Sequence, residues 1–162
     1  MSLFERPEYQ WRETFLILLD ESKRPVANAL LAQIQSLGSM VVSESRADDE
    51  GRFEFATVLA PDDFAAMDIS CVTGDEVLEQ IPELLKELEP NIASADEQEK
   101  LDRIKECTAR LDVLHFEQHS FEFDPDESEP DFMDPGGLFI VLERLAELVD
   151  GIIVDPQSAS VM

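Results

Sequence analysis

The clearest alternation of apolar and polar positions lies near the end of the chain, in residues 134–156. Apolar residues recur there at intervals of three and four, which places them on one face of a helix and charged residues on the other. The apolar set is Leu138, Val141, Leu142, Leu145, Leu148 and Val149, and the charged set is Glu143, Arg144 and Glu147. Asp134 and Pro135 are typical of a helix start, and Gly151 predicts a left-handed residue that ends the helix. Residues 152–154 then predict a short strand buried on both faces.

The first third of the chain predicts the order strand, helix, strand, strand. Five consecutive apolar residues within 14–20 predict a central strand. A helix follows Pro25 and ends at Gly38, and two strands at 40–46 and 52–59 flank a turn. The apolar stripe expected to be buried in the helix is Val26, Leu30, Ile34 and Leu37. This order predicts a ferredoxin-like element in the N-terminal half.

Two capping boxes predict helices in the middle of the chain. Thr73 and Glu76 predict the start of the first, in which Pro82 predicts a kink or a later start. Ser94 and Glu97 predict the start of the second. The positions expected to be buried are Val77, Leu78, Ile81, Leu84, Leu85 and Leu88 in the first helix, and Leu101 and Ile104 in the second.

Two further strands are predicted, at 66–72 and, from alternation in twos, from about residue 110 onward. Residues 120–134 form an acidic loop with several prolines, which we expect to be mobile. A chain of 162 residues is long enough to bury a core without disulfides or metal, so we expect one domain over 1–162. The order of elements predicts an α+β fold, with helices packed on a mainly antiparallel or mixed sheet.

The composition adds a strong negative charge to this picture. The chain has 37 Asp and Glu against 12 Lys and Arg, a formal net charge of −25. Such a chain repels DNA, RNA and anionic membranes, so we expect none of these as a partner. We expect a basic protein as a partner instead. Solubility and a salty environment explain the acidity without a partner. No signal or membrane segment is recognised, which predicts a cytoplasmic protein; a homodimer is also compatible with the sequence.

Both histidines lie in the segment HFEQH. On a strand, His115, Glu117 and His119 point to the same side, and on a helix the two histidines lie one turn apart, so two imidazoles could share a Zn²⁺ ion. This makes a metal-binding protein or metal-dependent enzyme the alternative function. The competing interpretation places the histidines on the exposed face of an edge strand, with Leu114 and Phe116 in the core. We expect no metal, because a closed zinc site usually has four ligands.

The acidic loop has oxygen ligands at alternate positions but not the calcium-binding pattern. That pattern needs glycine at its sixth position and glutamate at its twelfth, where this sequence has Glu129 and Pro135. We therefore expect the loop to face solvent or a basic partner. Its partner-facing residues are Asp124, Asp126, Glu127, Glu129 and Asp131.

Other motifs do not predict an active site or a cofactor. Gly136 and Gly137 precede a helix, but the acidic surroundings disfavour phosphate, and close packing of the helix start explains them better. Cys71 and Cys107 have no metal-ligand spacing and are expected to be buried thiols. A distant pairing of either cysteine with His115 stays open as a route to a nucleophile. We therefore name no catalytic residues.

The C-terminal segment LAELVDGIIVDPQSASVM resembles the close of several bacterial domains of unknown function. In these a helix, a glycine, a short apolar strand and an Asp-Pro-Gln turn complete an α+β fold. The residues that carry the resemblance are Leu148, Gly151, Val154, Asp155, Pro156 and Gln157. The resemblance implies a fold and no activity. We expect a small acidic, non-catalytic binding or regulatory module; the alternatives are the metal protein using His115 and His119 and an acidic mimic of nucleic acid.

Overall fold

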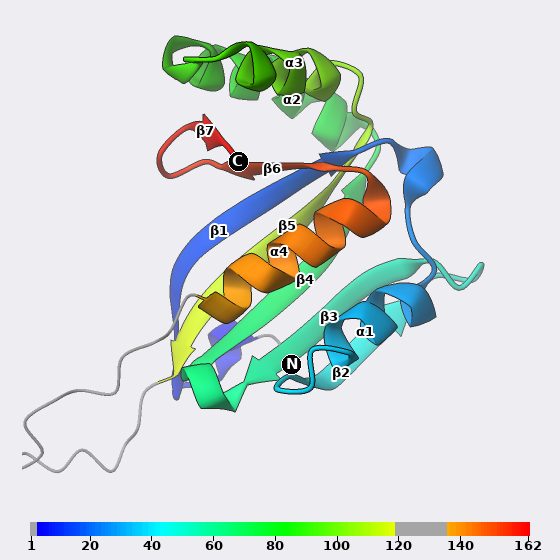
Figure 1. Ribbon diagram of the computed structural model, residues 1–162. Coiled ribbons are helices and arrows are strands. Elements are labelled where there is room, and N and C mark those ends of the chain that lie inside the picture. Colours follow the sequence, from blue (N-terminus) through cyan, green and yellow to red (C-terminus); the bar gives the residue numbers. More distant parts are fainter. Residues whose placement is uncertain (1–2, 119–135) are drawn as a thin grey trace, which may run out of the picture.

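The computed structural model describes residues 3–118 and 136–162, which form a seven-stranded sheet with helices on both faces (Figure 1). The strands are β1 Tyr9–Leu19, β2 Val41–Ala47, β3 Phe53–Ala60, β4 Ala65–Thr73, β5 Ala109–Gln118, β6 Ile152–Asp155 and β7 Ser160–Val161. The helices are α1 Ala27–Gln35, α2 Asp75–Leu88, α3 Ala95–Ile104 and α4 Gly136–Val149, with short 3₁₀ turns η1 Leu3–Glu5, η2 Glu21–Lys23, η3 Pro61–Asp63 and η4 Glu89–Asn91.

The strand order is β2-β3-β4-β5-β1-β6-β7, and neighbouring strands are antiparallel. The predicted α+β class with a mainly antiparallel sheet is therefore confirmed. The ferredoxin-like element expected in the N-terminal half is not confirmed. In a split βαβ unit one strand separates the two parallel strands, whereas three strands (β5, β4 and β3) separate β1 from β2 here.

Different helices cover the two faces of the sheet (Figure 1). On one face, α4 packs against β1 and α1 packs against β2 and β3, and Phe15, Ile17 and Leu19 of β1 belong to the core that they share. On the other, α2 and α3 pack against Leu16 and Leu18. Successive side chains of a strand point to opposite faces, so an apolar run such as this one fits a strand covered on both sides. As expected, β1 is an interior strand, between β5 and β6.

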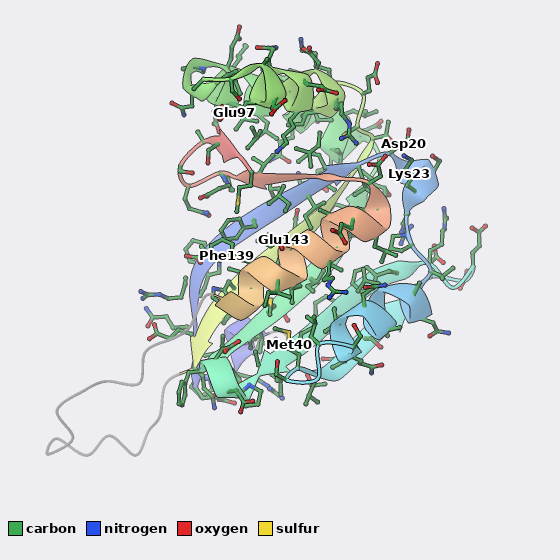
Figure 2. All side chains as sticks on the ribbon, viewed as in Figure 1. Asp20, Lys23, Met40, Glu97, Phe139 and Glu143 are labelled. Atoms are coloured by element: carbon green, nitrogen blue, oxygen red, sulfur yellow. The ribbon has the colours of Figure 1, made fainter. Side chains whose placement is uncertain are left out.

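The predicted faces of α4 and β6 are confirmed. The α4 residues turned to the sheet are buried, and Glu143 is exposed on the outer side of the helix (Figure 2). In β6, Ile153 belongs to one core, and Ile152 and Val154 belong to the other. The predicted helix start at Asp134 and Pro135 lies outside the described residues.

The predicted capping box of α3 is confirmed, but the prediction of a capping box at the start of α2 is wrong. The amide of Glu97 donates to Oγ of Ser94 at 3.1 Å, and Oε2 of Glu97 accepts from the amide of Ala93. In α2 the N-cap is Gly74, with a φ of 88° and no side-chain capping bond. The helix then continues past Pro82, because the burial of four apolar side chains outweighs one missing backbone hydrogen bond.

Two apolar residues expected in buried faces are exposed. Val26 is the N-cap of α1, so its side chain lies outside the helical stripe that packs on the sheet. Leu78 is half-exposed because α2 contacts the sheet through a narrower stripe than expected. That stripe consists of Val77, Ile81, Leu84 and Leu88.

Gly151 is not the left-handed residue that ends α4, contrary to the prediction from the sequence. The left-handed residue is Asp150, with a φ of 50°. The amide of Gly151 donates to the carbonyl of Ala146 at 2.9 Å and that of Asp150 to the carbonyl of Glu147, the pattern of a Schellman motif. Gly151 is needed for another reason: a Cβ atom there would lie 2.7 Å from Cγ2 of Ile17.

Only part of the second face is covered by α2 and α3. Farther along β4 and β5, Leu3 of η1 packs against Ala66 and Phe116. Asp68 is buried beneath this segment, where its carboxylate accepts from the amide of Leu3 at 3.1 Å and the hydroxyl of Thr57 at 2.7 Å. Within the described residues, no helix is long and apolar enough to cross a membrane.

Candidate functional site

An open groove of about 350 Å³ lies between α2 and β5. Its walls are long α2 side chains, and its remaining lining residue is Arg110 of β5. The α2 residues stand at positions i, i+3, i+4 and i+7, so they form one stripe beside the apolar stripe that packs on the sheet. They are Glu76, Glu79, Gln80 and Glu83, and all four are exposed.

Arg110 and Asp112 form a forked ion pair beside this groove. The two residues stand two apart on β5, which puts both side chains on the face that α2 covers. Nε of Arg110 donates to Oδ1 of Asp112 at 2.6 Å, and Nη2 donates to Oδ2 at 3.3 Å. Burial raises the pKa of Asp112, against the opposing effect of Arg110. The pair neutralises the guanidinium charge without using all of its donors.

The third nitrogen of this guanidinium has no acceptor. Arg110 is 8% exposed, and its Nη1 is buried without a hydrogen-bond partner, one of two such side-chain atoms in the described part of the chain. A buried donor left unpaired costs roughly 1–3 kcal/mol, and more when the group is charged. The groove is therefore lined by a residue that has one buried, unused donor.

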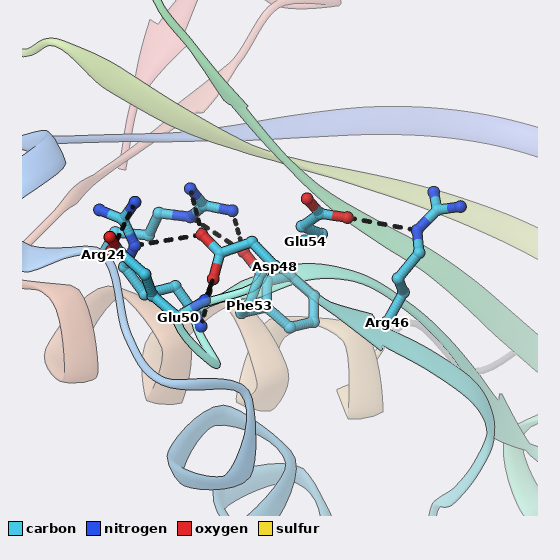
Figure 3. A network of polar contacts seen from close by, with 7 residues as sticks. Arg24, Arg46, Asp48, Glu50, Phe53 and Glu54 are labelled. Atoms are coloured by element: carbon cyan, nitrogen blue, oxygen red, sulfur yellow. Dashed lines mark hydrogen bonds and ion pairs between the residues drawn. The ribbon is translucent and has the colours of Figure 1, made fainter.

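Most cationic side chains of the protein are used in pairs elsewhere. At the β2–β3 turn, Arg24 and Arg52 both contact Asp48, and Arg46 pairs with Glu54 on the adjoining strands (Figure 3). The backbone amide of Arg52 donates a hydrogen bond to Asp48, and this bond is the main reason that the pKa of the Asp48 carboxyl group is lowered. The amide of Glu50 donates a second such bond. These contacts fix the turn against the segment that leads into α1, and they leave the cations unavailable to α2.

The glutamates of the groove have no such partners. None of the ion pairs within residues 3–118 and 136–162 includes Glu76, Glu79 or Glu83. Three uncompensated carboxylates therefore face a groove whose single cation is already neutralised by Asp112. The electrostatic potential of the groove is negative, so it attracts cations and repels anions.

His115 lies in a different environment from the one expected. It is fully buried on β5, an interior strand, so its interpretation as an exposed residue of an edge strand is wrong. Its Nδ1 lies 3.3 Å from Oε1 of Glu13, directly across the β1–β5 pair, and its Nε2 has no partner among the described residues. Burial lowers the pKa of His115, although Glu13 opposes this effect.

The structure brings together only part of the predicted metal-binding set. Glu117 lies on the same side of β5 as His115, but its carboxylate is 3.4 Å from Nε of Arg12. His119 lies outside the described residues. Within the described residues, no group of three or more His, Cys, Asp and Glu could hold a metal ion. The described residues thus include only His115 and Glu117 of the predicted set.

The two cysteines do not have the properties of nucleophiles. Burial raises the pKa of Cys107 to about 11 and also raises that of Cys71. A reactive cysteine requires the opposite shift, because the thiolate is the attacking form. Cys107 is buried, as expected, whereas Cys71 is only partly buried.

The other predicted positions have mixed outcomes. The acidic loop residues Asp124, Asp126, Glu127, Glu129 and Asp131 lie outside the described residues. Close packing is confirmed at the start of α4, where a Cβ atom on Gly137 would collide with Oδ2 of Asp63. A carboxylate thus already lies beside the first turn of this helix, which disfavours a phosphate there.

Sequence analysis missed the groove, although one pattern could have indicated part of it. The stripe Glu76, Glu79, Glu83 is visible as acidic residues at helical spacing, whereas we used only the apolar positions of this segment. Arg110 followed by Asp112 on a strand predicts a same-face ion pair, but not its burial. In comparisons with known proteins, no protein-family model, no curated protein and no solved structure matches this chain.

Proposed function

We propose that this protein is a non-catalytic binding or regulatory module that docks a basic segment of a partner protein in the α2–β5 groove. The observation that carries the proposal is the stripe of three glutamates that lines the groove without cationic partners. Their charges are uncompensated within the described structure, while Arg110, the one arginine among the lining residues, is paired with Asp112. Lysine and arginine side chains of a partner would supply the missing cations.

The expected interaction is moderate in strength and sensitive to salt. Each exposed ion pair contributes roughly 0.2–1 kcal/mol, so three pairs contribute about 0.6–3 kcal/mol. The net charge of −25 adds long-range attraction, which raises association rates for a basic partner by roughly 10–1,000-fold at low ionic strength. Because the Debye length falls to about 8 Å at physiological ionic strength, much of this attraction is screened as salt increases.

Charge-neutralising variants test the proposal. Glu76, Glu79 and Glu83 are replaced together by Gln, and binding of an octalysine peptide is measured by calorimetry at low and at physiological salt. We expect the triple variant to bind at least about threefold more weakly than the parent, from three lost pairs of modest strength. Equal affinity for parent and variant would refute docking in this groove.

A matched control separates the groove from total charge. Glu99, Glu143 and Glu147 are exposed on α3 and α4 and take part in no ion pair within the described residues. Replacing these three by Gln changes the net charge by the same amount as the groove variant. We expect this control to retain most of the affinity of the parent. An equal loss in both triple variants would mean that the peptide responds to overall charge.

A further inference from the structure

We infer that the groove binds the main chain of its partner as well as its charged side chains. A carbonyl oxygen of the partner peptide accepts a hydrogen bond from Nη1 of Arg110. This inference rests on the function proposed above and names the chemistry of the ligand. Two independent observations meet in it. One is the acidic stripe of α2. The other is Arg110, a lining residue of the same groove, whose Nη1 is buried and has no hydrogen-bond partner among the described residues.

The fork to Asp112 gives Arg110 a fixed orientation. Two of its nitrogens are held by one carboxylate, so the plane of the guanidinium is set before any ligand arrives. Nη1 is the remaining nitrogen, and the structure provides no acceptor for it within the described residues. Such a preorganised donor can bind an oxygen ligand from outside the described residues.

The charges around the donor decide which kind of oxygen fits. A phosphate or free carboxylate would bring negative charge next to Glu76, Glu79 and Glu83, and it would find the charge of Arg110 already neutralised. A polyamine would satisfy the glutamates but has no acceptor for Nη1. A basic peptide supplies both, because its side chains carry the cations and its carbonyl groups are neutral acceptors.

The length of the groove matches a short peptide. Glu76 and Glu83 are seven residues apart on α2, which corresponds to about 10 Å along the helix axis. An extended peptide of four residues spans about 13 Å, enough to pass both glutamates and the arginine between α2 and β5. Nη1 is buried, so a carbonyl oxygen reaches it only when the side chains that cover it move, a motion that exposed side chains make within nanoseconds.

Two probes of equal charge separate main-chain binding from charge alone. Acetyl-tetralysine amide and spermine each carry four positive charges, but only the peptide has carbonyl groups. Their dissociation constants are measured for the parent and for Arg110→Lys, which keeps a cation beside Asp112 and removes Nη1. We expect the parent to bind the peptide about tenfold more tightly than spermine, as one charge-assisted hydrogen bond predicts. We expect Arg110→Lys to abolish that difference.

The outcomes distinguish this inference from the proposed function. Equal affinity of the parent for both probes, or a preference that persists in Arg110→Lys, overturns the carbonyl contact. If the Gln variant of the three groove glutamates weakens neither probe, the proposed function itself fails. Should Arg110→Lys unfold, nitrogen NMR of the parent provides the test. The peptide, but not spermine, is expected to shift the guanidinium signals of Arg110, and no difference between the probes overturns the inference.

Discussion

Replacing Gly151 by Ala tests the packing at the end of α4. The added Cβ atom would lie 2.7 Å from Cγ2 of Ile17 and 2.9 Å from the carbonyl oxygen of Leu18. Real Cβ atoms do not approach other heavy atoms so closely, so something must move. Leu18 is paired with Ile152 across the β1–β6 ladder. Its backbone can therefore move away from the added Cβ atom only if this pairing is weakened. The strain therefore falls on the strand pair that joins β6 to the sheet.

The size of the effect follows from two opposing contributions. Overpacking of a well-packed core costs typically 1–3 kcal/mol. Against it, Ala restricts the unfolded chain and stabilises the fold by about 0.4–1 kcal/mol where the backbone conformation allows it, as it does at Gly151, whose φ is not positive. We expect a net loss of roughly 1–2 kcal/mol. For a chain of this length that corresponds to a decrease of about 2–8 °C in melting temperature.

Gly151→Asn distinguishes the packing explanation from a left-handed helix end. Asn adopts a positive φ more readily than Ala, so at a left-handed position Gly151→Asn would be the less harmful change. Steric conflict at Cβ predicts that Asn is at least as destabilising as Ala. Urea denaturation of the parent and both variants gives the free energies of unfolding. A clearly more stable Asn variant, or no loss in either variant, would refute the packing that the structure shows.

Three further predictions concern the core, the buried histidine and the net charge. Leu145→Ala, on the buried face of α4, should lower the free energy of unfolding by about 2–5 kcal/mol in chemical denaturation, whereas exposed Glu143→Ala should change it little; similar values would mean that the helix face is misassigned. Burial lowers the pKa of His115, so below about pH 6.5 the unfolded chain binds this proton more readily than the folded chain. The free energy of unfolding should therefore fall as the pH decreases from 7 to 5, and less steeply in His115→Gln; equal slopes would contradict this. Melting temperature should rise with NaCl as the Debye length contracts from about 30 Å at 0.01 M to about 3 Å at 1 M, and a flat curve would show that the carboxylates are already compensated.

The sequence alone determined the features that depend on neighbouring residues. Apolar periodicity identified the buried face of α4, because side chains three and four apart lie together on any helix. Ser94 and Glu97 marked the start of α3, since a capping box is completed within four residues. The five consecutive apolar residues of β1 predicted a central strand. These results need no knowledge of what the segments pack against.

The tertiary structure alone decided which strands are neighbours, and with that the environment of each polar side chain. His115 is buried because β5 lies between β4 and β1. The spacing of residues in HFEQH does not indicate where its strand lies in the sheet. Gly151 is required because Ile17 and Leu18, remote in sequence, lie against it. The groove exists because the fold places α2 beside Arg110 of β5. Burial and charge compensation depend on contacts between distant segments, whereas periodicity records only which face of its own element a residue occupies.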